Sequence, residues 1–278
     1  MTDRRLTPAN ARVAARHLQG RVQAERFVTP EPASVAVPVA DLWATPERTA
    51  RDRQLLYGEA VEIYERRGGM AFLRAAKDGY VGYVAEAELG PPGSASHIVG
   101  VPATHLYPAP DMKRVAAMRL SFGARLRVVA GTDRFFETAE GLFVPRPHIT
   151  PANRAFTDPA SVAQLFFGVP YLWGGNSSDG IDCSGLVQAA CLACHIPCPG
   201  DSDLQEGVLG TALAEEPPQR GDLYFWKGHV AIAVDGEVLI HANAHHMAVA
   251  YEPIAAAIAR IEEQGDGPVT ARRRLARD

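Results

Sequence analysis

The stretch Tyr171-Leu172-Trp173-Gly174-Gly175, followed by Asp182-Cys183-Ser184-Gly185-Leu186, predicts a glycine-rich loop that leads into the start of a helix. Cys183 would then stand in the first helical turn. The unpaired N–H groups and the positive end of the helix dipole favour a thiolate there, and the same N–H groups can hold the oxyanion of a tetrahedral intermediate. Cys183 is therefore a candidate nucleophile, and its general base must come from elsewhere.

Two histidines that could supply this base lie in a segment with the pattern of antiparallel strands, at residues 222–226, 229–234 and 237–241, with a turn at Asp235-Gly236. A two-residue turn would pair His229 with Ala242 and place the two imidazoles on opposite faces, because side chains alternate along a strand. A three-residue loop, from Val234 to a left-handed Gly236, pairs His229 directly with His241. We predict the three-residue loop.

This register predicts a three-residue catalytic chain. Cys183 attacks, His229 shuttles the proton, and His241 holds the His229 ring in its useful tautomer. The mechanism requires neither a metal ion nor an organic cofactor.

These segments resemble the NlpC/P60 family of papain-like cysteine peptidases, which cut cell-wall peptides. The resemblance is carried by PYLWGG, DGIDCSGL, GDLYFWKGHVAIAV and LIHA, and it extends over roughly residues 155–262. It implies an α+β fold in which a helix bundle carrying the cysteine packs against an antiparallel sheet carrying the histidines. It also implies hydrolysis of amide bonds that involve D-glutamate or diaminopimelate.

Ahead of this core, short strands are broken by Gly, Pro and Asp. Candidate strands span residues 36–43, 60–65, 70–75 and 80–84, and after a linker at 90–94 a second set includes 104–107, 125–130, 135–138 and 142–144. The first set is similar to bacterial SH3-type domains. We predict an N-terminal segment (1–30), two small SH3-like β-barrels (31–91 and 92–149), the catalytic domain (150–265) and a basic tail (266–278).

Two such domains before such a core are similar to the γ-D-glutamyl-L-diamino acid endopeptidases of the dipeptidyl-peptidase VI type, whose substrates carry a free N-terminal L-alanine. The resemblance places Tyr171 in the oxyanion pocket and implies five substrate-binding residues: Asp182, Ser184, Ser202, Tyr80 and Asp52. Asp52 stands where glutamate is expected, one methylene short, and Gly200 replaces a common arginine. Structural interpretations stay open, because Asp182 and Ser202 can cap helices and Tyr80 can belong to a barrel core.

Three further cysteines are interpreted as packing residues. Cys191 and Cys194 follow the helical spacing of the apolar positions around them, and Cys198 is interpreted in the same way. Residues 191–195 also match the C-x-x-C-H pattern of covalent haem attachment. A zinc site formed by Cys191, Cys194 and Cys198 with His241, His245 and His246 is possible but poorly spaced. We expect His245 and His246 to face solvent or the cleft rim.

Composition restricts the partners. The 278 residues exceed the usual single-domain size, and 47% hydrophobic with 22% charged residues suffices for substantial cores. A net charge of −4 argues against nucleic acid, and the basic run Arg272-Arg273-Arg274 is expected to be solvated. Because no apolar run reaches the length of a signal peptide or membrane span, we expect no membrane partner and a reduced, cytoplasmic location. Export by a signal-independent route stays open.

We therefore predict a cysteine peptidase that hydrolyses the γ-D-glutamyl–diamino acid bond of small murein peptides with a free N-terminal L-Ala, in cell-wall peptide recycling. Two other functions stay open. One is a cell-wall or peptide-binding module with an inactive core, against which the intact set of Cys183, His229 and His241 argues. The other is an acyltransferase or amidase that uses the same site.

Overall fold

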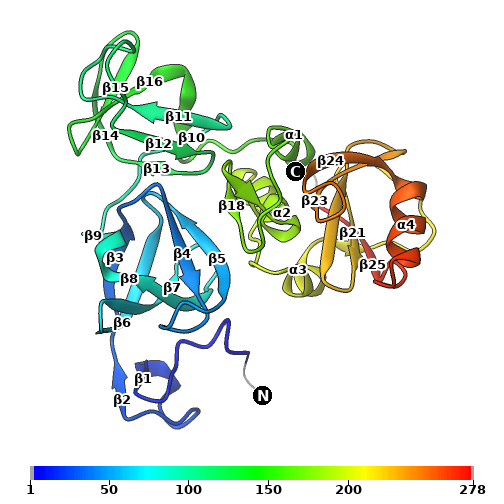
Figure 1. Ribbon diagram of the computed structural model, residues 1–278, viewed down its shortest axis with the longest axis horizontal. Helices are drawn as coiled ribbons and strands as arrows, with labels where there is room; N and C mark the ends of the chain where they lie inside the picture. Colours follow the sequence, from blue (N-terminus) through cyan, green and yellow to red (C-terminus); the bar gives the residue numbers. More distant parts are fainter. Residues whose placement is uncertain (1–2, 277–278) are drawn as a thin grey trace. The chain divides into compact units, whose positions relative to one another are not determined.

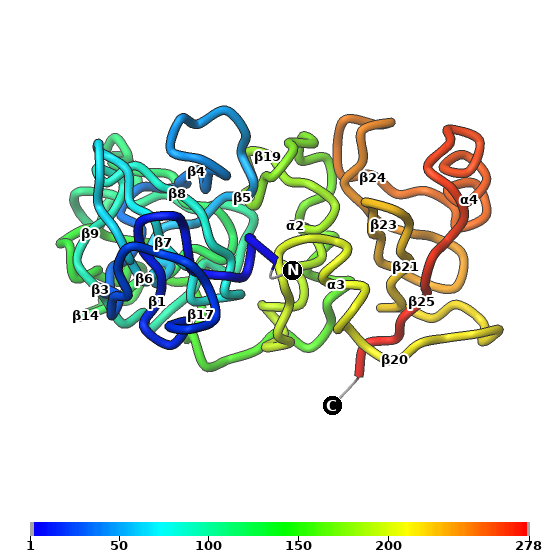
Figure 2. The backbone as a smooth tube through the Cα atoms, turned by 90° about the horizontal axis from the view of Figure 1, so that it is seen from below, coloured from blue at the N-terminus to red at the C-terminus, as the bar shows by residue number. Residues whose placement is uncertain are grey.

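The computed structural model describes residues 3–276, which belong to two compact units, Met1–Arg154 and Ala155–Asp278 (Figures 1 and 2). Within the described residues, the first unit consists of strands, turns and short 3-10 helices, and the second carries the four α-helices. Each unit has a hydrophobic core of its own. The expected strand-rich region ahead of a mixed α+β core is confirmed.

A seven-stranded antiparallel sheet dominates the first unit, in the order β5-β4-β8-β7-β6-β3-β9. Its strands are β3 (Glu31–Val35), β4 (Val39–Trp43), β5 (Arg51–Leu56), β6 (Ala60–Arg67), β7 (Met70–Ala75), β8 (Val81–Ala85) and β9 (Leu89–Gly90). Strand β5 is absent from the predicted set because its first residues are polar. Gln54 is nevertheless buried, and it donates to Asp41 on β4 at 2.9 Å.

The N-terminal segment packs onto this sheet. Strands β1 (Val13–Ala15) and β2 (Arg26–Val28) form a parallel pair, joined through the 3-10 helix η1 (Arg16–Leu18). Val13 lies in a cluster with Phe72 and Val81 of the sheet. Arg12 adds an ion pair of 2.7 Å with Glu65.

Three smaller sheets complete the first unit around one core that includes Leu106, Leu120, Leu126 and Val144. They comprise β10 (His97–Val99) with β13 (Arg125–Leu126) and β17 (Ile149–Pro151), β11 (Ala103–Leu106) with β12 (Met118–Ser121), and β14 (Val128–Gly131) with β15 (Phe135–Thr138) and β16 (Phe143–Pro145). The 3-10 helices η2 (Glu86–Glu88) and η3 (Arg146–His148) lie in the connections.

The second unit is built on a six-stranded antiparallel sheet in the order β20-β25-β21-β22-β23-β24. Its strands are β20 (Thr211–Ala212), β21 (Asp222–Trp226), β22 (His229–Ala233), β23 (Val238–Asn243), β24 (Ala248–Pro253) and β25 (Ala271–Arg274). Helices α1 (Pro159–Gln164), α2 (Cys183–Ala193) and α3 (Ser202–Val208) lie on one side of it, and α4 (Ile254–Glu263) lies on the other (Figure 1).

Helical spacing explains how α4 binds the sheet. Ile254, Ala257 and Ile261 recur at intervals of three and four residues, so they share one face of the helix. That face packs against Tyr224 and Ala231 of the sheet. On the opposite side, α1 and α2 contact β22 and β23, and the small hairpin of β18 (Asn176–Ser177) and β19 (Gly180–Ile181) precedes α2.

The predicted register between β22 and β23 is wrong by two residues. Ala233 pairs with Leu239 and Ile232 with Ile240, and this register, extended along the strands, brings His229 opposite Asn243 rather than His241. The cause is the side chain of Asp235, whose Oδ1 accepts hydrogen bonds from the N–H groups of residues 237 and 238 at 2.8 Å. This Asx turn closes the loop over residues 235–237. Because the shift is even, both histidines still share one face.

The C-terminal segment also differs from the solvated end that its three arginines suggested. Residues 271–274 form β25, a strand between β20 and β21. The Arg274 guanidinium donates two hydrogen bonds of 2.8 Å to Asp222, whose side chain is completely buried. A buried carboxylate requires such a partner, so this basic residue belongs to the sheet. Between residues 3 and 276, no helix is long and apolar enough to cross a membrane.

Candidate active site

The start of α2 is held by Asp182. Its carboxylate accepts hydrogen bonds from the Gly185 N–H at 2.6 Å and from the Gly174 N–H at 3.0 Å, so it caps the helix and also fixes the preceding loop. Gly174 has a φ of 69°, a conformation that favours glycine. The helix-capping interpretation of Asp182 is confirmed, and it explains how this loop presents the next residue.

Cys183 is the first residue of α2 and is 7% exposed. Its Sγ lies 4.0 Å from the carbonyl oxygen of Gly228, the residue directly before His229. Tyr171 belongs to the same neighbourhood. Burial raises the pKa of its hydroxyl well above the ordinary value, and the nearby Cys183 and Asp182 add to this effect. The thiol at the helix start thus lies beside the residue that precedes β22, and the tyrosine is close enough to the thiol to feel its charge.

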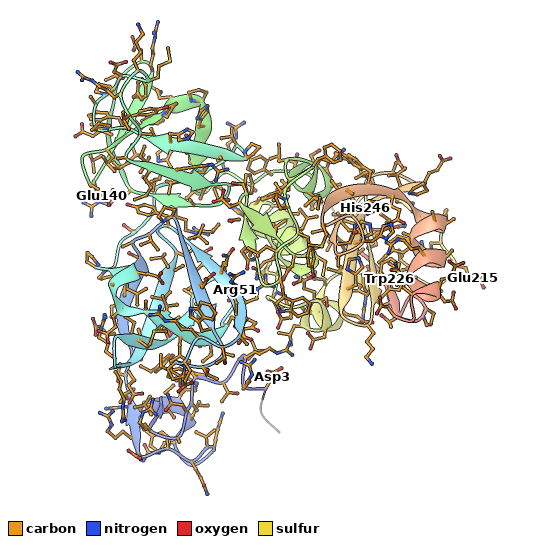
Figure 3. The ribbon with its side chains drawn as sticks, viewed as in Figure 1. Asp3, Arg51, Glu140, Glu215, Trp226 and His246 are labelled. Atoms are coloured by element: carbon orange, nitrogen blue, oxygen red, sulfur yellow. The ribbon has the colours of Figure 1, made fainter. Side chains whose placement is uncertain are left out.

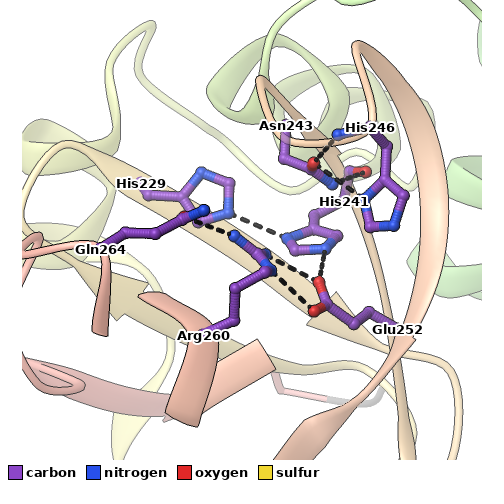
Figure 4. Close-up of polar contacts among 7 residues, drawn as sticks. All are labelled: His229, His241, Asn243, His246, Glu252, Arg260 and Gln264. Carbon is purple, nitrogen blue, oxygen red and sulfur yellow. Dashed lines mark hydrogen bonds and ion pairs between the residues drawn. The ribbon is translucent and has the colours of Figure 1, made fainter. Parts of the chain in front are cut away.

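His229 and His241 are hydrogen-bonded to each other, with 2.9 Å between Nε2 of His229 and Nδ1 of His241 (Figure 4). His241 is completely buried. Burial, with a contribution from His241, lowers the pKa of His229 to about 3. His229 is therefore a neutral imidazole near pH 7, which is the form that can accept a proton. The buried ring of Trp226 (Figure 3) packs beside this pair, with its centroid 5.6 Å from that of the His229 ring.

Two charged residues extend this chain. Nε2 of His241 lies 3.1 Å from Oε2 of Glu252 on β24, and Arg260 of α4 donates two hydrogen bonds of 2.8 Å to the same carboxylate (Figure 4). Hydrogen bonds from Arg260 and His241 hold the pKa of Glu252 well below its ordinary value. The sequence reasoning missed both residues. No motif marks them, and only the pairing of β23 with β24 brings Glu252 to the histidines.

Of the two serines predicted to bind substrate, Ser184 directly follows Cys183, and Ser202 belongs to α3, which contacts α2. The Ser184 hydroxyl donates to Asp182 at 3.0 Å, so this hydroxyl supports the helix cap. Ser202 is the first residue of α3, whose N-cap is Asp201, so the alternative in which Ser202 caps that helix is wrong. Gln205 of α3 donates to the Ser184 carbonyl at 2.9 Å and thereby ties the two helices together.

Tyr80 and Asp52 belong to the first unit. Tyr80 is 2% exposed and lies in the hydrophobic core of the seven-stranded sheet, as its structural interpretation expects. Asp52 accepts hydrogen bonds from the Arg4 guanidinium at 2.7 and 2.9 Å. Their roles in substrate binding stay predictions.

The remaining cysteines are structural. Cys191 is completely buried and Cys198 is 3% exposed, whereas burial raises the pKa of the half-buried Cys194 to about 12. Attachment of haem at Cys191 would require α2 to leave the sheet, so the C-x-x-C-H match is not a haem site.

One group of possible metal ligands exists in the described part of the chain. Donor atoms of His241, His246 and Glu252 lie within 4.8 Å of one another. Both oxygens of Glu252 already accept from Arg260, so a cation bound there would face a guanidinium. The residues therefore suit a hydrogen-bonded histidine chain better than a metal centre. His245 and His246 are exposed, as expected, and His246 is tied to Asn243 at 2.9 Å.

Comparison with known proteins agrees with this geometry. The sequence model of the NlpC/P60 family matches residues 168–260, and that of the bacterial dipeptidyl-peptidase Sh3 domain matches residues 42–89. The gamma-D-glutamyl-L-lysine dipeptidyl-peptidase of Bacillus cereus is 25% identical over 247 residues, which cover 77% of this chain and 73% of that protein. Its counterpart in Bacillus subtilis is 27% identical, with 68% and 71% covered. A crystal structure of an NlpC/P60 family protein from Bacillus cereus has the same fold, with a TM-score of 0.74, 21% identity and coverage of 88% and 99%.

Proposed function

We propose that this chain is a cysteine peptidase that hydrolyses the γ-D-glutamyl–diamino acid bond of murein peptides. The chain carries an NlpC/P60 domain that follows a bacterial SH3 domain in the sequence. The observation that carries the proposal is the placement of Cys183 at a helix start, beside a strand whose first residue is hydrogen-bonded to a second histidine. The relatives named as gamma-D-glutamyl-L-lysine dipeptidyl-peptidases support the choice of bond.

The chemistry follows from the charge states. Neutral His229 takes the thiol proton as the Cys183 sulfur attacks the γ-carbonyl carbon of D-glutamate. N–H groups at the start of α2 stabilise the resulting oxyanion, and the Tyr171 hydroxyl assists them. The protonated His229 then donates its proton to the leaving amine as the C–N bond breaks, which leaves an L-Ala-γ-D-Glu thioester. Water, deprotonated by His229, hydrolyses the thioester and restores the thiol.

Recognition of the free L-alanine amine is the second part of the proposal. An ammonium group that loses water needs carboxylate and hydroxyl partners. We assign this role to Asp182, Ser184 and Ser202 of the second unit, and Asp182 would combine it with capping of α2. For Tyr80 and Asp52 of the first unit the role stays a prediction from the resemblance, and Asp52 would have to exchange its contact with Arg4.

We place the activity in cytoplasmic recycling of cell-wall peptides. All four cysteines are free thiols, which suits a reducing compartment. Detection of the protein outside the cytoplasm after cell fractionation would contradict this placement.

The decisive assay incubates the protein with L-Ala-γ-D-Glu-diaminopimelate, with the corresponding lysine peptide and with both N-acetylated peptides. Fragments are identified by mass. We expect cleavage at the γ-D-glutamyl bond, and only when the amine is free. Equal cleavage of the acetylated peptides would remove the amine site, and no cleavage of any peptide would remove the proposed bond specificity.

Cys183→Ala is expected to lower kcat/KM by at least about 10³-fold while the fold is kept, because it removes the nucleophile. Cys194→Ala provides a matched control, since Cys194 is a half-buried thiol at the other end of the same helix. Hydrolysis retained by Cys183→Ala would refute the mechanism.

A further inference from the structure

We propose that Glu252 is a positioning residue that sets the tautomers of both catalytic histidines and thereby makes Nδ1 of His229 the base. The inference rests on the proposed peptidase function, which it deepens. Neither the predicted catalytic set nor the family resemblance includes this residue.

The carboxylate of Glu252 fixes the tautomer of His241. An ionised carboxylate can only accept hydrogen bonds. Because Nε2 of His241 lies 3.1 Å from Oε2 of Glu252, the proton of the His241 ring must be on Nε2. Nδ1 of a neutral His241 is then an acceptor.

The hydrogen bond between His241 and His229 then fixes the tautomer of His229. Nδ1 of His241 lies 2.9 Å from Nε2 of His229, so the His229 ring must carry its proton on Nε2. Nδ1 of His229 is left with a free electron pair. The carboxylate therefore determines, through two rings, which nitrogen can take the proton of Cys183.

Arg260 keeps Glu252 in this role. Its two hydrogen bonds of 2.8 Å hold both oxygens of the carboxylate and keep it ionised. Arg260 also bonds to Gln264 at 2.8 Å, which fixes the arginine on α4 (Figure 4). Among the described residues, the charged and titratable groups that act on His229 are His241 on β23, Glu252 on β24 and Arg260 on α4, and the thiol of Cys183 on α2 lies beside the preceding Gly228.

Glu252→Gln tests the proposal because an amide cannot satisfy both neighbours. If the amide oxygen of the variant accepts from Arg260 Nε, the amide NH2 group donates to His241 and reverses the tautomers of both histidines. If the amide is turned the other way, its NH2 group faces the Nε–H group of Arg260, and this hydrogen bond is lost. We expect kcat for the γ-D-glutamyl peptide to fall by about 10²-fold with KM nearly unchanged. This is less than the loss of about 10⁴-fold in a serine peptidase when the triad aspartate is replaced by asparagine and the histidine takes the wrong tautomer. We also expect the limb of the pH–rate profile that reports His229 to move to lower pH, since the carboxylate favours the imidazolium.

Glu65→Gln is the matched control. Glu65 is also a buried carboxylate held by an arginine, Arg12, but it lies in the first unit. Both variants are expected to lose stability, and only Glu252→Gln should lose kcat and shift the pH profile. An unshifted profile with a kcat loss no larger than that of Glu65→Gln would overturn the proposal.

A measurement on the wild-type chain does not depend on how the variant folds. Nitrogen-15 NMR of the imidazoles identifies which ring nitrogen carries the proton. We expect Nε2–H on both His229 and His241, and Nδ1–H on either would refute the inference. If these tautomers are found but the wild type cleaves no γ-D-glutamyl peptide, the proposed function fails and the positioning role stands.

Discussion

Gly185 tests whether close packing at the start of α2 is required to present Cys183. A Cβ atom on residue 185 would lie 2.4 Å from the Gly175 carbonyl oxygen and 3.1 Å from Oδ1 of Asp182. The Gly185 N–H already donates to this Asp182 oxygen at 2.6 Å. Gly185→Ala must therefore displace either the glycine-rich loop or the first turn of the helix.

The magnitude follows from three contributions. Alanine is favoured over glycine inside a helix by about 1 kcal/mol. Overpacking costs about 1–3 kcal/mol, and the upper half of that range applies because the obstacle is a backbone oxygen that cannot rotate away. Weakening the N-cap costs about 1 kcal/mol more. The expected net loss of unfolding free energy is about 2–3 kcal/mol, or about 10 °C in the Tm of a unit of this size.

Gly207→Ala is the control because its added Cβ, on α3, has no atom within 4 Å. It is expected to stabilise the second unit by up to about 1 kcal/mol. Calorimetric unfolding of both variants gives the comparison, and kcat of Gly185→Ala should fall because the sulfur moves with the first turn. Equal stability of the two variants would refute the packing argument.

Two further predictions concern the second unit. The free energy of unfolding should decrease as pH falls below about 6.5, because unfolded His229 binds a proton at its ordinary pKa whereas the folded side chain does so only near pH 3. In urea titrations between pH 8 and 5, His229→Asn should reduce the dependence of the unfolding free energy on pH. An unchanged dependence would contradict the prediction. Asp222→Asn should lower the Tm because it removes the carboxylate that Arg274 needs. Asp266→Asn, at an exposed position, should leave the Tm unchanged. Equal Tm values for the two variants would show that β25 does not depend on the ion pair between Asp222 and Arg274.

The proposed catalytic set was accessible from sequence because each of its members lies beside a local signal. Glycines and an aspartate mark the helix that begins at Cys183, and alternating apolar residues mark the strands that carry His229 and His241. Local patterns of this kind arise from backbone geometry that involves only a few neighbouring residues. They do not determine register. The carboxylate of Asp235 competes as an acceptor for turn N–H groups and moved the pairing by two residues.

Features that arise only from tertiary contacts were not accessible. Arg272-Arg273-Arg274 has the composition of a solvated end, and its place in the sheet depends on the buried Asp222, far away in sequence. Glu252 likewise has no local signal. It faces His241 because β24 pairs with β23, and it is kept ionised by an arginine of the next helix.

The charges around His229 finally indicate how the reaction starts. Burial is the largest influence on its pKa, and His241 and Arg260 lower the pKa further, against the opposite effect of Glu252. The ion pair of Glu252 with Arg260 leaves the carboxylate able to orient His241 but offsets the charge that would hold an imidazolium. His229 is therefore neutral before substrate binds, which is the state that the proposed mechanism requires of its base. In that mechanism the negative charge passes to the oxyanion, and the N–H groups at the start of α2 would stabilise it.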